Sequence, residues 1–187
     1  MLWRVEHLDL AALDAGLDEI RGSPSDVGSL DLIVRRPEVE AREVLEEGLL
    51  DADEGLVGDC WRARGAGSTP DGSANPKAQL TLANVRAVAL VARDPDRRAL
   101  AGDQLYVDFD LSVENAPPGT RLEIGSAVVE ITDLPHTGCR KYLDRFGKDA
   151  LRWVNSEVGR ALNLRGVNAT VVVGGTVRRG DSVRKTI

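Results

Sequence analysis

From residue 80 onward the apolar side chains mostly have the spacing of β-strands, and this pattern restricts the possible folds more than any other feature. In Asp103–Leu111 the side chains alternate, with Leu105, Val107, Phe109 and Leu111 on one face and Gln104, Tyr106, Asp108 and Asp110 on the other. Such alternation predicts a half-buried strand. Leu122–Ile124 and Ala127–Ile131 flank Gly125-Ser126, a dipeptide typical of a tight hairpin. Leu80–Ala92, rich in Val, Leu and Ala, is also interpreted as β-structure.

Helical spacing appears only once in this part of the chain. Apolar residues recur every three or four positions from Phe146 through Ala150, Trp153 and Val158 to Leu162, which predicts an amphipathic helix of about four turns. Strand spacing returns in Val167–Val173, and Thr176–Val183 completes the pattern after a turn at Gly174-Gly175. Many short strands, Gly and Pro turns and one main late helix predict a mainly β fold with helices (α+β), of the barrel type.

The N-terminal part is less regular. Leu13–Ile20 has helical spacing, Leu30–Arg35 reads as a strand, and residues 39–50 are compatible with either a helix or a strand. Gly65–Pro76 consists largely of Gly, Ser, Pro, Asn and Asp, which predicts a surface loop or flap. We expect residues 1–54 to be an N-terminal extension packed on the same domain as the barrel of residues 55–187.

Length and composition exclude several classes of protein. A chain of 187 residues is long enough for one domain with a real core. Two cysteines cannot build a disulfide scaffold, so we expect a reducing, cytoplasmic setting. No segment approaches the ~20 apolar residues of a membrane helix. A net charge of −6 argues against broad binding to nucleic acid or to an anionic membrane.

The charge is unevenly distributed along the chain. Residues 1–139 have a net charge of −13, whereas residues 140–187 have a net charge of +7. One interpretation is a solvated basic helix and tail that neutralise an acidic body. The other is an anion site, because clustered Arg and Lys side chains are suited to bind phosphate.

Cys139 is the leading candidate for a reactive group. The thiolate is the nucleophilic and metal-binding form of cysteine, and neighbouring cations such as Arg140 and Lys141 favour it. The alternative is a small buried hydrophobe. His136 is a candidate base for this thiol, or simply a hydrogen-bonded loop histidine. Cys60, next to Trp61, is better explained as a structural thiol.

Two further polar groups have two interpretations each. Glu114-Asn115 follows the alternating strand and is either a hydrogen-bonding pair or part of an Asx-type turn. Arg165 and Asn168 flank Gly166, where they either line a pocket or belong to the end of a helix finished by glycine.

Five segments in this order resemble the MOSC-domain family, named after the C-terminal domain of molybdenum cofactor sulfurases. They are Gly55–Asp59, Asp103–Asn115, the Arg121–Thr132 hairpin, the Cys139 loop with Phe146-Gly147, and Leu164–Ala169 leading to Gly175–Asp181. The resemblance covers about residues 55–185. It departs at Cys60-Trp61-Arg62, where relatives often carry a histidine-containing stretch.

The resemblance implies a MOSC-like β-barrel whose pocket opens around Cys139, the residue that ligates molybdenum or carries sulfur in the family. We therefore expect the chain to bind the molybdenum cofactor (molybdopterin) with Cys139 as metal ligand and catalytic residue. The other candidate cofactor-binding residues are Asn84, Arg86, Glu114, Asn115, His136, Thr137, Arg140, Lys141, Arg165 and Asn168. The expected reaction is reduction of a small N-hydroxylated or N-oxide compound.

Two cysteines are too few for the four ligands of an iron–sulfur cluster, so the electrons are expected from a separate partner protein. The pyridoxal-phosphate lyase domain of the larger sulfurases has no counterpart in these 187 residues. One alternative is a non-enzymatic carrier of the cofactor or of a persulfide on Cys139, supplied by a separate sulfur donor. Another is a thiol hydrolase or transferase that uses Cys139 with His136. The sequence indicates no oligomeric state.

Overall fold

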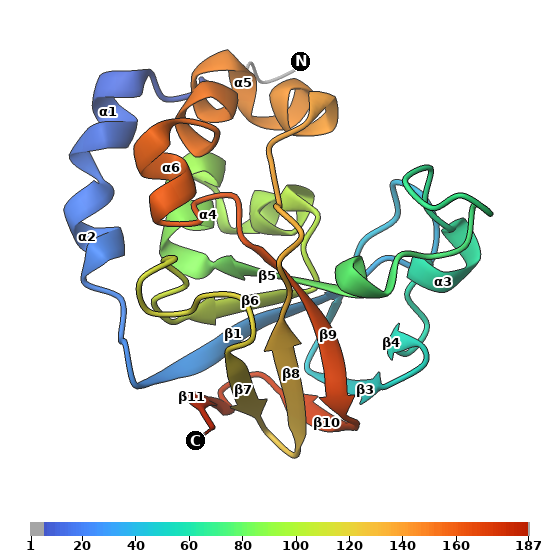
Figure 1. Ribbon diagram of the computed structural model, residues 1–187. Helices are drawn as coiled ribbons and strands as arrows, with labels where there is room; N and C mark the ends of the chain where they lie inside the picture. The colour runs from blue at the N-terminus through green and yellow to red at the C-terminus, as the bar shows by residue number, and fades with distance from the viewer. Residues whose placement is uncertain (1–5, 187) are drawn as a thin grey trace.

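Seven strands form a closed barrel, with most of the helices gathered over one end (Figure 1). The computed structural model describes residues 6–186. The barrel strands are β1 (Val27–Arg35), β5 (Leu80–Asn84), β6 (Leu105–Asp108), β7 (Arg121–Ile124), β8 (Ala127–Ile131), β9 (Val167–Val173) and β11 (Ser182–Lys185). Their order around the barrel is β11-β7-β8-β9-β5-β6-β1, and pairing of β1 with β11 closes it. This confirms the predicted α+β fold of the barrel type.

The odd number of strands explains the region that the sequence predicts incorrectly. Seven strands cannot alternate in direction all the way around a ring, so one neighbouring pair must be parallel, and that pair is β5 and β6. Parallel neighbours need a crossover, which α4 (Val85–Ala92) and the 3₁₀ helix η2 (Pro95–Ala101) supply. The prediction of β-structure throughout Leu80–Ala92 is therefore wrong after Asn84. The Asn84 side chain accepts hydrogen bonds from the backbone of Arg86 and Ala87 and so caps α4.

The remaining strands lie outside the closed barrel. β2 (Glu43–Leu45) pairs with β1, and β10 (Gly175–Arg178), β3 (Glu47–Asp51) and β4 (Gly55–Leu56) form a small second sheet. Residues 39–50, left open by the sequence, thus contain strands. Thr176–Val183 is split into β10 and β11 by a turn at Gly180, whose φ is +89°. The proposed boundary at residue 54 does not coincide with an edge of the barrel, because β1 precedes it.

Two apolar cores lie on either side of the barrel wall. Val107 and Phe109 belong to the core inside the barrel, whereas Tyr106 belongs to the core between the barrel and the helices. Both faces of β6 are therefore buried, and the prediction of a half-buried strand over residues 103–111 is wrong in this respect. The regular strand is also shorter, spanning Leu105–Asp108.

The helices that cover the barrel are α1 (Leu10–Ala15), α2 (Leu17–Arg21), α4, α5 (Arg140–Val154) and α6 (Glu157–Ala161) (Figure 1); α3 (Trp61–Arg64) and the 3₁₀ helix η1 (Pro76–Ala78) lie to one side. The predicted late helix begins earlier, at Arg140, and is not continuous. Gly147 interrupts α5 with φ +88° and ψ 171°, and Ser156 caps the separate helix α6. None of the helices in residues 6–186 combines the length and apolar character needed to span a membrane.

Candidate functional site

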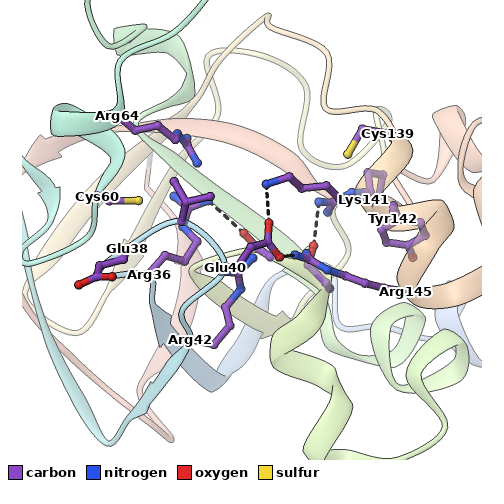
Figure 2. A pocket seen from close by; sticks show the side chains of 14 residues that line it. Arg36, Glu38, Glu40, Arg42, Cys60, Arg64, Cys139, Lys141, Tyr142 and Arg145 are labelled. Carbon is purple, nitrogen blue, oxygen red and sulfur yellow. Dashed lines mark hydrogen bonds and ion pairs between the residues drawn. The ribbon is translucent and has the colours of Figure 1, made fainter.

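A cationic cavity opens between the start of α5, the β1–β2 loop and α3 (Figure 2). It encloses about 580 Å³ including its open mouth. Its charged and sulfur-bearing lining residues are Arg36, Arg42, Arg64, Lys141, Arg145, Arg165, Glu38, Glu40, Cys60 and Cys139. Six cations thus face two carboxylates, and the two thiols of the chain share the same cavity. A site of this charge favours an anionic ligand.

Cys139 lies at the mouth, on the residue that precedes α5. Its backbone is extended, its side chain is exposed, and among residues 6–186 its thiol takes part in no hydrogen bond. The loop before it is fixed from both sides. Asn155 Oδ1 accepts from the Gly138 N–H at 2.9 Å and its Nδ2 donates to the Gly138 carbonyl at 3.2 Å, while Asn168 Nδ2 donates to the Leu134 carbonyl at 3.0 Å. The thiol is therefore accessible on a well-anchored backbone.

Glycine at position 138 allows this close packing. A Cβ there would lie 2.7 Å from Leu151 Cδ1 and 2.9 Å from Val154 Cγ2, both on α5. The absence of a side chain allows the loop to lie against the end of α5, where Asn155 reaches it.

The back wall of the cavity contains a buried ion pair between Arg165 and Asp103. Arg165 Nη1 donates to both Asp103 oxygens, at 2.8 and 3.0 Å, and Nη2 donates to the Ala101 carbonyl at 3.0 Å. Asp103 has no exposed surface, and the Arg165 side chain is 9% exposed. Burial alone would raise the pKa of Asp103, but the charge of Arg165 and the hydrogen bond from His136 lower it to about 2.

His136 completes this arrangement behind the wall. Its Nε2 lies 2.9 Å from Asp103 Oδ1. Because an ionised carboxylate only accepts hydrogen bonds, Nε2 carries the proton and donates it. Burial and the nearby charge of Arg165 lower the pKa of His136, so the ring is neutral at pH 7.

A second buried pair belongs to the same wall, because Arg36 and Arg165 donate to the carbonyls of the neighbouring residues Gly102 and Ala101. Arg36 Nε and Nη2 each donate to Asp59 at 2.9 Å, in a two-pronged contact, and Arg36 Nη1 donates to the Gly102 carbonyl at 3.1 Å. Asp59 is fully buried and also accepts from the backbone N–H groups of Arg36 and Trp61. The Gly-Asp dipeptide near the start of the resemblance thus positions an arginine of the cavity.

At the mouth a single carboxylate bridges two cations. Lys141 Nζ donates to Glu40 Oε1, and Arg145 Nη2 donates to Glu40 Oε2 (Figure 2). These two hydrogen bonds lower the pKa of Glu40 to about 2. Unlike the carboxylates of the wall, that of Glu40 is 56% exposed.

Some donor atoms and two arginines of the cavity lack a partner among the described residues. Arg165 Nε and Arg42 Nε are buried without a hydrogen-bond acceptor, and no described carboxylate pairs with Arg42 or Arg64. Burial, with repulsion from Arg145 and Arg36, lowers the pKa of Arg42. An anion with several acceptor oxygens would relieve both the unmet donors and the repulsion.

Three of the residues singled out from the sequence line this cavity, namely Cys139, Lys141 and Arg165. His136 and Asn168 line a second cavity. Arg140 is exposed and pairs with Asp144 at 2.9 Å, and Thr137 is exposed on the loop.

The remaining candidates lie outside the cationic cavity. Asn84 caps α4 and donates to Ser23 Oγ and the Phe109 carbonyl. Arg86 pairs with Asp108 at 2.7 Å beside α2. Asn115 accepts from Lys185 Nζ at 2.6 Å, and Glu114 is exposed.

The sequence interpretation missed several residues of the cavity. Arg36, Glu40, Arg42 and Arg145 were not singled out, and Cys60 was interpreted as a structural thiol, whereas it lines the cavity. Arg35-Arg36 at the end of a predicted strand could have indicated the site, because a charged side chain next to a buried strand needs a partner.

Comparison with known proteins supports the fold. No model of a protein family matches this chain, and no curated protein sequence matches it. Solved structures do: the YuaD protein of Bacillus subtilis (TM-score 0.62, 15% identity, 84% of this chain and 94% of that chain), YiiM of Escherichia coli (0.55, 17%, 85% and 70%) and YiiM of Geobacillus stearothermophilus (0.53, 11%, 88% and 75%). YuaD and YiiM are MOSC-domain proteins. The chain therefore has a MOSC-like fold, as its sequence resemblance predicts.

Proposed function

We propose that this chain binds the molybdenum cofactor in the cationic cavity, with Cys139 Sγ as a ligand of the metal. The observation that carries the proposal is that an exposed thiol shares one cavity with six cationic side chains. A thiolate is a soft ligand suited to a metal already bound by sulfur, and Arg and Lys side chains are suited to the phosphate of the cofactor.

The residues present fit such a group. Arg42 and Arg64 both line the cavity, and no described carboxylate pairs with either, so an oxyanion entering the cavity would find guanidinium groups that have no counter-charge within residues 6–186. The Cys139 thiol is free of hydrogen bonds within the same part of the chain.

Under this proposal each part of the cavity has a distinct task. Cys139 provides the sulfur ligand, held in place through Gly138 by Asn155. Arg36 and Arg165, fixed by Asp59 and Asp103, form a rigid cationic wall that orients the bound group. When bound, the cofactor would supply a metal centre able to exchange two electrons.

The reaction that we assign is reduction of a small N-hydroxylated compound. R–NHOH takes up two electrons and two protons, its N–O bond breaks, and R–NH₂ and water leave. The electrons come from outside these 187 residues, and we assign them to a separate donor protein, because two cysteines cannot bind an iron–sulfur cluster through four thiolates. An N-oxide substrate follows the same balance.

Metal content tests the binding step. Wild type, Cys139→Ser and Cys60→Ser are purified without oxygen from a host that makes the cofactor, and molybdenum and pterin fluorescence are measured. Cys60 is the matched control, because its thiol lines the same cavity. We expect wild type and Cys60→Ser to carry molybdenum and Cys139→Ser to lose it. Wild type without molybdenum or pterin, or Cys139→Ser with an undiminished metal content, would contradict the proposal.

A second function, a carrier of sulfur as a persulfide on Cys139, is favoured by the exposure of that thiol to a donor protein. Turnover separates the two. With a reduced viologen dye as electron donor, a reductase consumes hydroxylaminopurine, whereas a carrier leaves it intact and releases thiocyanate when cyanide removes the outer sulfur.

The hydrolase alternative has no such support, because His136 binds Asp103 and no hydrogen bond joins it to Cys139 within the described residues.

A further inference from the structure

We infer that Glu40 is a built-in counter-anion of the cationic cavity, and that a ligand carrying a phosphate-type oxyanion binds by displacing its carboxylate from Lys141 and Arg145. The inference deepens the proposed function: it rests on that function for the identity of the natural ligand, but not for the chemistry of displacement. Glu40 would thereby set both the affinity of the site and the minimum charge of the anion that it accepts.

The carboxylate of Glu40 binds the cations of the cavity as an anionic ligand would. Each of its two oxygens accepts from one cation, and both cations belong to α5, about a hundred residues further along the chain. Lys141 and Arg145 both line the cavity. An oxyanion with two or more acceptor oxygens presents the same pattern of acceptors.

The backbone of Glu40 indicates that these contacts hold the loop in an unfavourable conformation. Its φ is +70°, in the left-handed region that residues with long side chains rarely adopt. Loss of the contacts to Lys141 and Arg145 would release this strain. Release of Glu40 therefore recovers part of the energy that the ion pairs supplied.

The surroundings favour a ligand over Glu40 in two ways. Glu40 is 56% exposed, and ion pairs at such positions contribute little because water screens them. A phosphate has a charge of about −1.5 to −2 at pH 7 and more acceptor oxygens than a carboxylate. It can therefore also pair with Arg64, which lines the cavity from α3 and has no carboxylate partner among residues 6–186. A singly charged carboxylate gains no such advantage and should not displace Glu40.

The chain offers a matched control in Glu38. Both glutamates line the cavity, and each loses one negative charge on substitution by glutamine. Of these two glutamates, only Glu40 takes part in an ion pair within the described chain. A general change in the electrostatic field would affect both variants alike, whereas competition for Lys141 and Arg145 affects Glu40→Gln alone.

The test measures binding of inorganic phosphate, pyrophosphate and acetate to the cofactor-free protein by calorimetry at fixed ionic strength. We expect Glu40→Gln to bind phosphate and pyrophosphate about three- to tenfold more tightly than wild type, and Glu38→Gln to change affinity less than about twofold. Acetate should bind wild type weakly or not at all. Lys141→Gln should weaken phosphate binding. Unchanged or weaker phosphate binding by Glu40→Gln, or an equal gain in Glu38→Gln, would overturn the inference.

Hydrogen exchange gives a second readout that electrostatics alone would not change. A bound ligand normally protects the loops that contact it, but displacement predicts faster amide exchange of residues 38–42 when pyrophosphate is added to wild type. Protection of this loop would contradict the inference. Because neither measurement needs molybdenum, failure of the proposed function and failure of this inference are distinguishable.

Discussion

The back wall and the mouth of the cavity both contain carboxylates paired with cations, but the pairs have different properties. In the wall, Asp103 and Asp59 are fully buried, and each binds an arginine through two short contacts together with further hydrogen bonds. At the mouth, Glu40 binds its cations while more than half exposed to water. Burial, rather than the identity of the charges, determines whether such a pair fixes the structure or can be exchanged for a ligand.

The difference is explained by what each pair leaves behind when it breaks. A buried arginine without its carboxylate remains a charge in a poorly solvated place, and losing one partner of a buried pair costs about 3–5 kcal/mol. At the mouth, Lys141 is 58% exposed and can be hydrated when Glu40 leaves, and Arg145 keeps its hydrogen bond to the Leu100 carbonyl. The wall is therefore expected to be rigid in the absence of a ligand, and the mouth to be the part that responds to one.

The largest predicted effect is the loss of the charge of Asp103. Asp103→Asn leaves Arg165 buried without a counter-charge and should lower the free energy of unfolding by about 3 kcal/mol or more, measured by urea denaturation. The control is Asp144→Asn, which removes the partner of the exposed Arg140 and should change stability by less than about 0.5 kcal/mol. Equal effects of the two substitutions would refute the distinction between wall and surface.

A smaller effect is expected at Asn155, which holds the loop before Cys139. Asn155→Ala removes both hydrogen bonds to Gly138 and should cost about 1–2 kcal/mol in urea denaturation. Because the loop then moves more freely, the rate of reaction of Cys139 with a thiol reagent should also change, measured in a Cys60→Ser background. A loss of stability without any change in that rate would mean that Asn155 does not position the thiol.

The pH dependence of stability should come from the wall. Since the pKa of His136 in the folded protein is below its ordinary value of 6.5, the unfolded chain binds a proton first as pH falls. Stability is therefore full above pH 6.5 and decreases below it, by about 1 kcal/mol or less between pH 6.5 and 5.5.

His136→Gln isolates this contribution, because glutamine can still donate to Asp103 but does not titrate. Its stability should vary less with pH in this interval, whereas Glu40→Gln should keep the wild-type dependence. The contribution of Asp103, whose pKa is about 2, should be lost only below its ordinary value of 3.8. Identical pH profiles of wild type and His136→Gln between pH 7 and 5 would contradict this assignment.

The local pattern of the sequence predicted much of the barrel. Strand β9 and the β7–β8 hairpin depend on spacing and a two-residue turn, and both have the predicted positions. The prediction of β-structure for residues 85–92 failed because the same Val, Leu and Ala content also suits a buried helix. A crossover is required there only by the closure of a seven-stranded ring, which no local pattern indicates. The burial of Tyr106 likewise depends on helices packed over it from distant parts of the chain.

Residues of the candidate site could be predicted where they belong to a recognisable motif, but not where their role depends on a partner far away in the sequence. Cys139, Lys141 and Arg165 belong to segments that resemble a family, and they line one cavity. Arg86 carries the same charge but pairs with Asp108 elsewhere. The role of Arg165 depends on Asp103, 62 positions away, and no local pattern indicates such a pairing.

The smallest predicted effect separates strain from charge at the mouth. Both Glu40→Gln and Glu40→Asn remove the ion pairs with Lys141 and Arg145, but asparagine adopts a left-handed backbone more readily than glutamine does. If the loop kept its φ of +70°, Glu40→Asn would melt about 1–2 °C higher than Glu40→Gln, and the ion pairs would not be the cause of the strain. We expect equal melting temperatures instead, because the loop relaxes once the carboxylate has left Lys141 and Arg145. Phosphate added to wild type should then reproduce that relaxation, because the ligand removes the same two contacts.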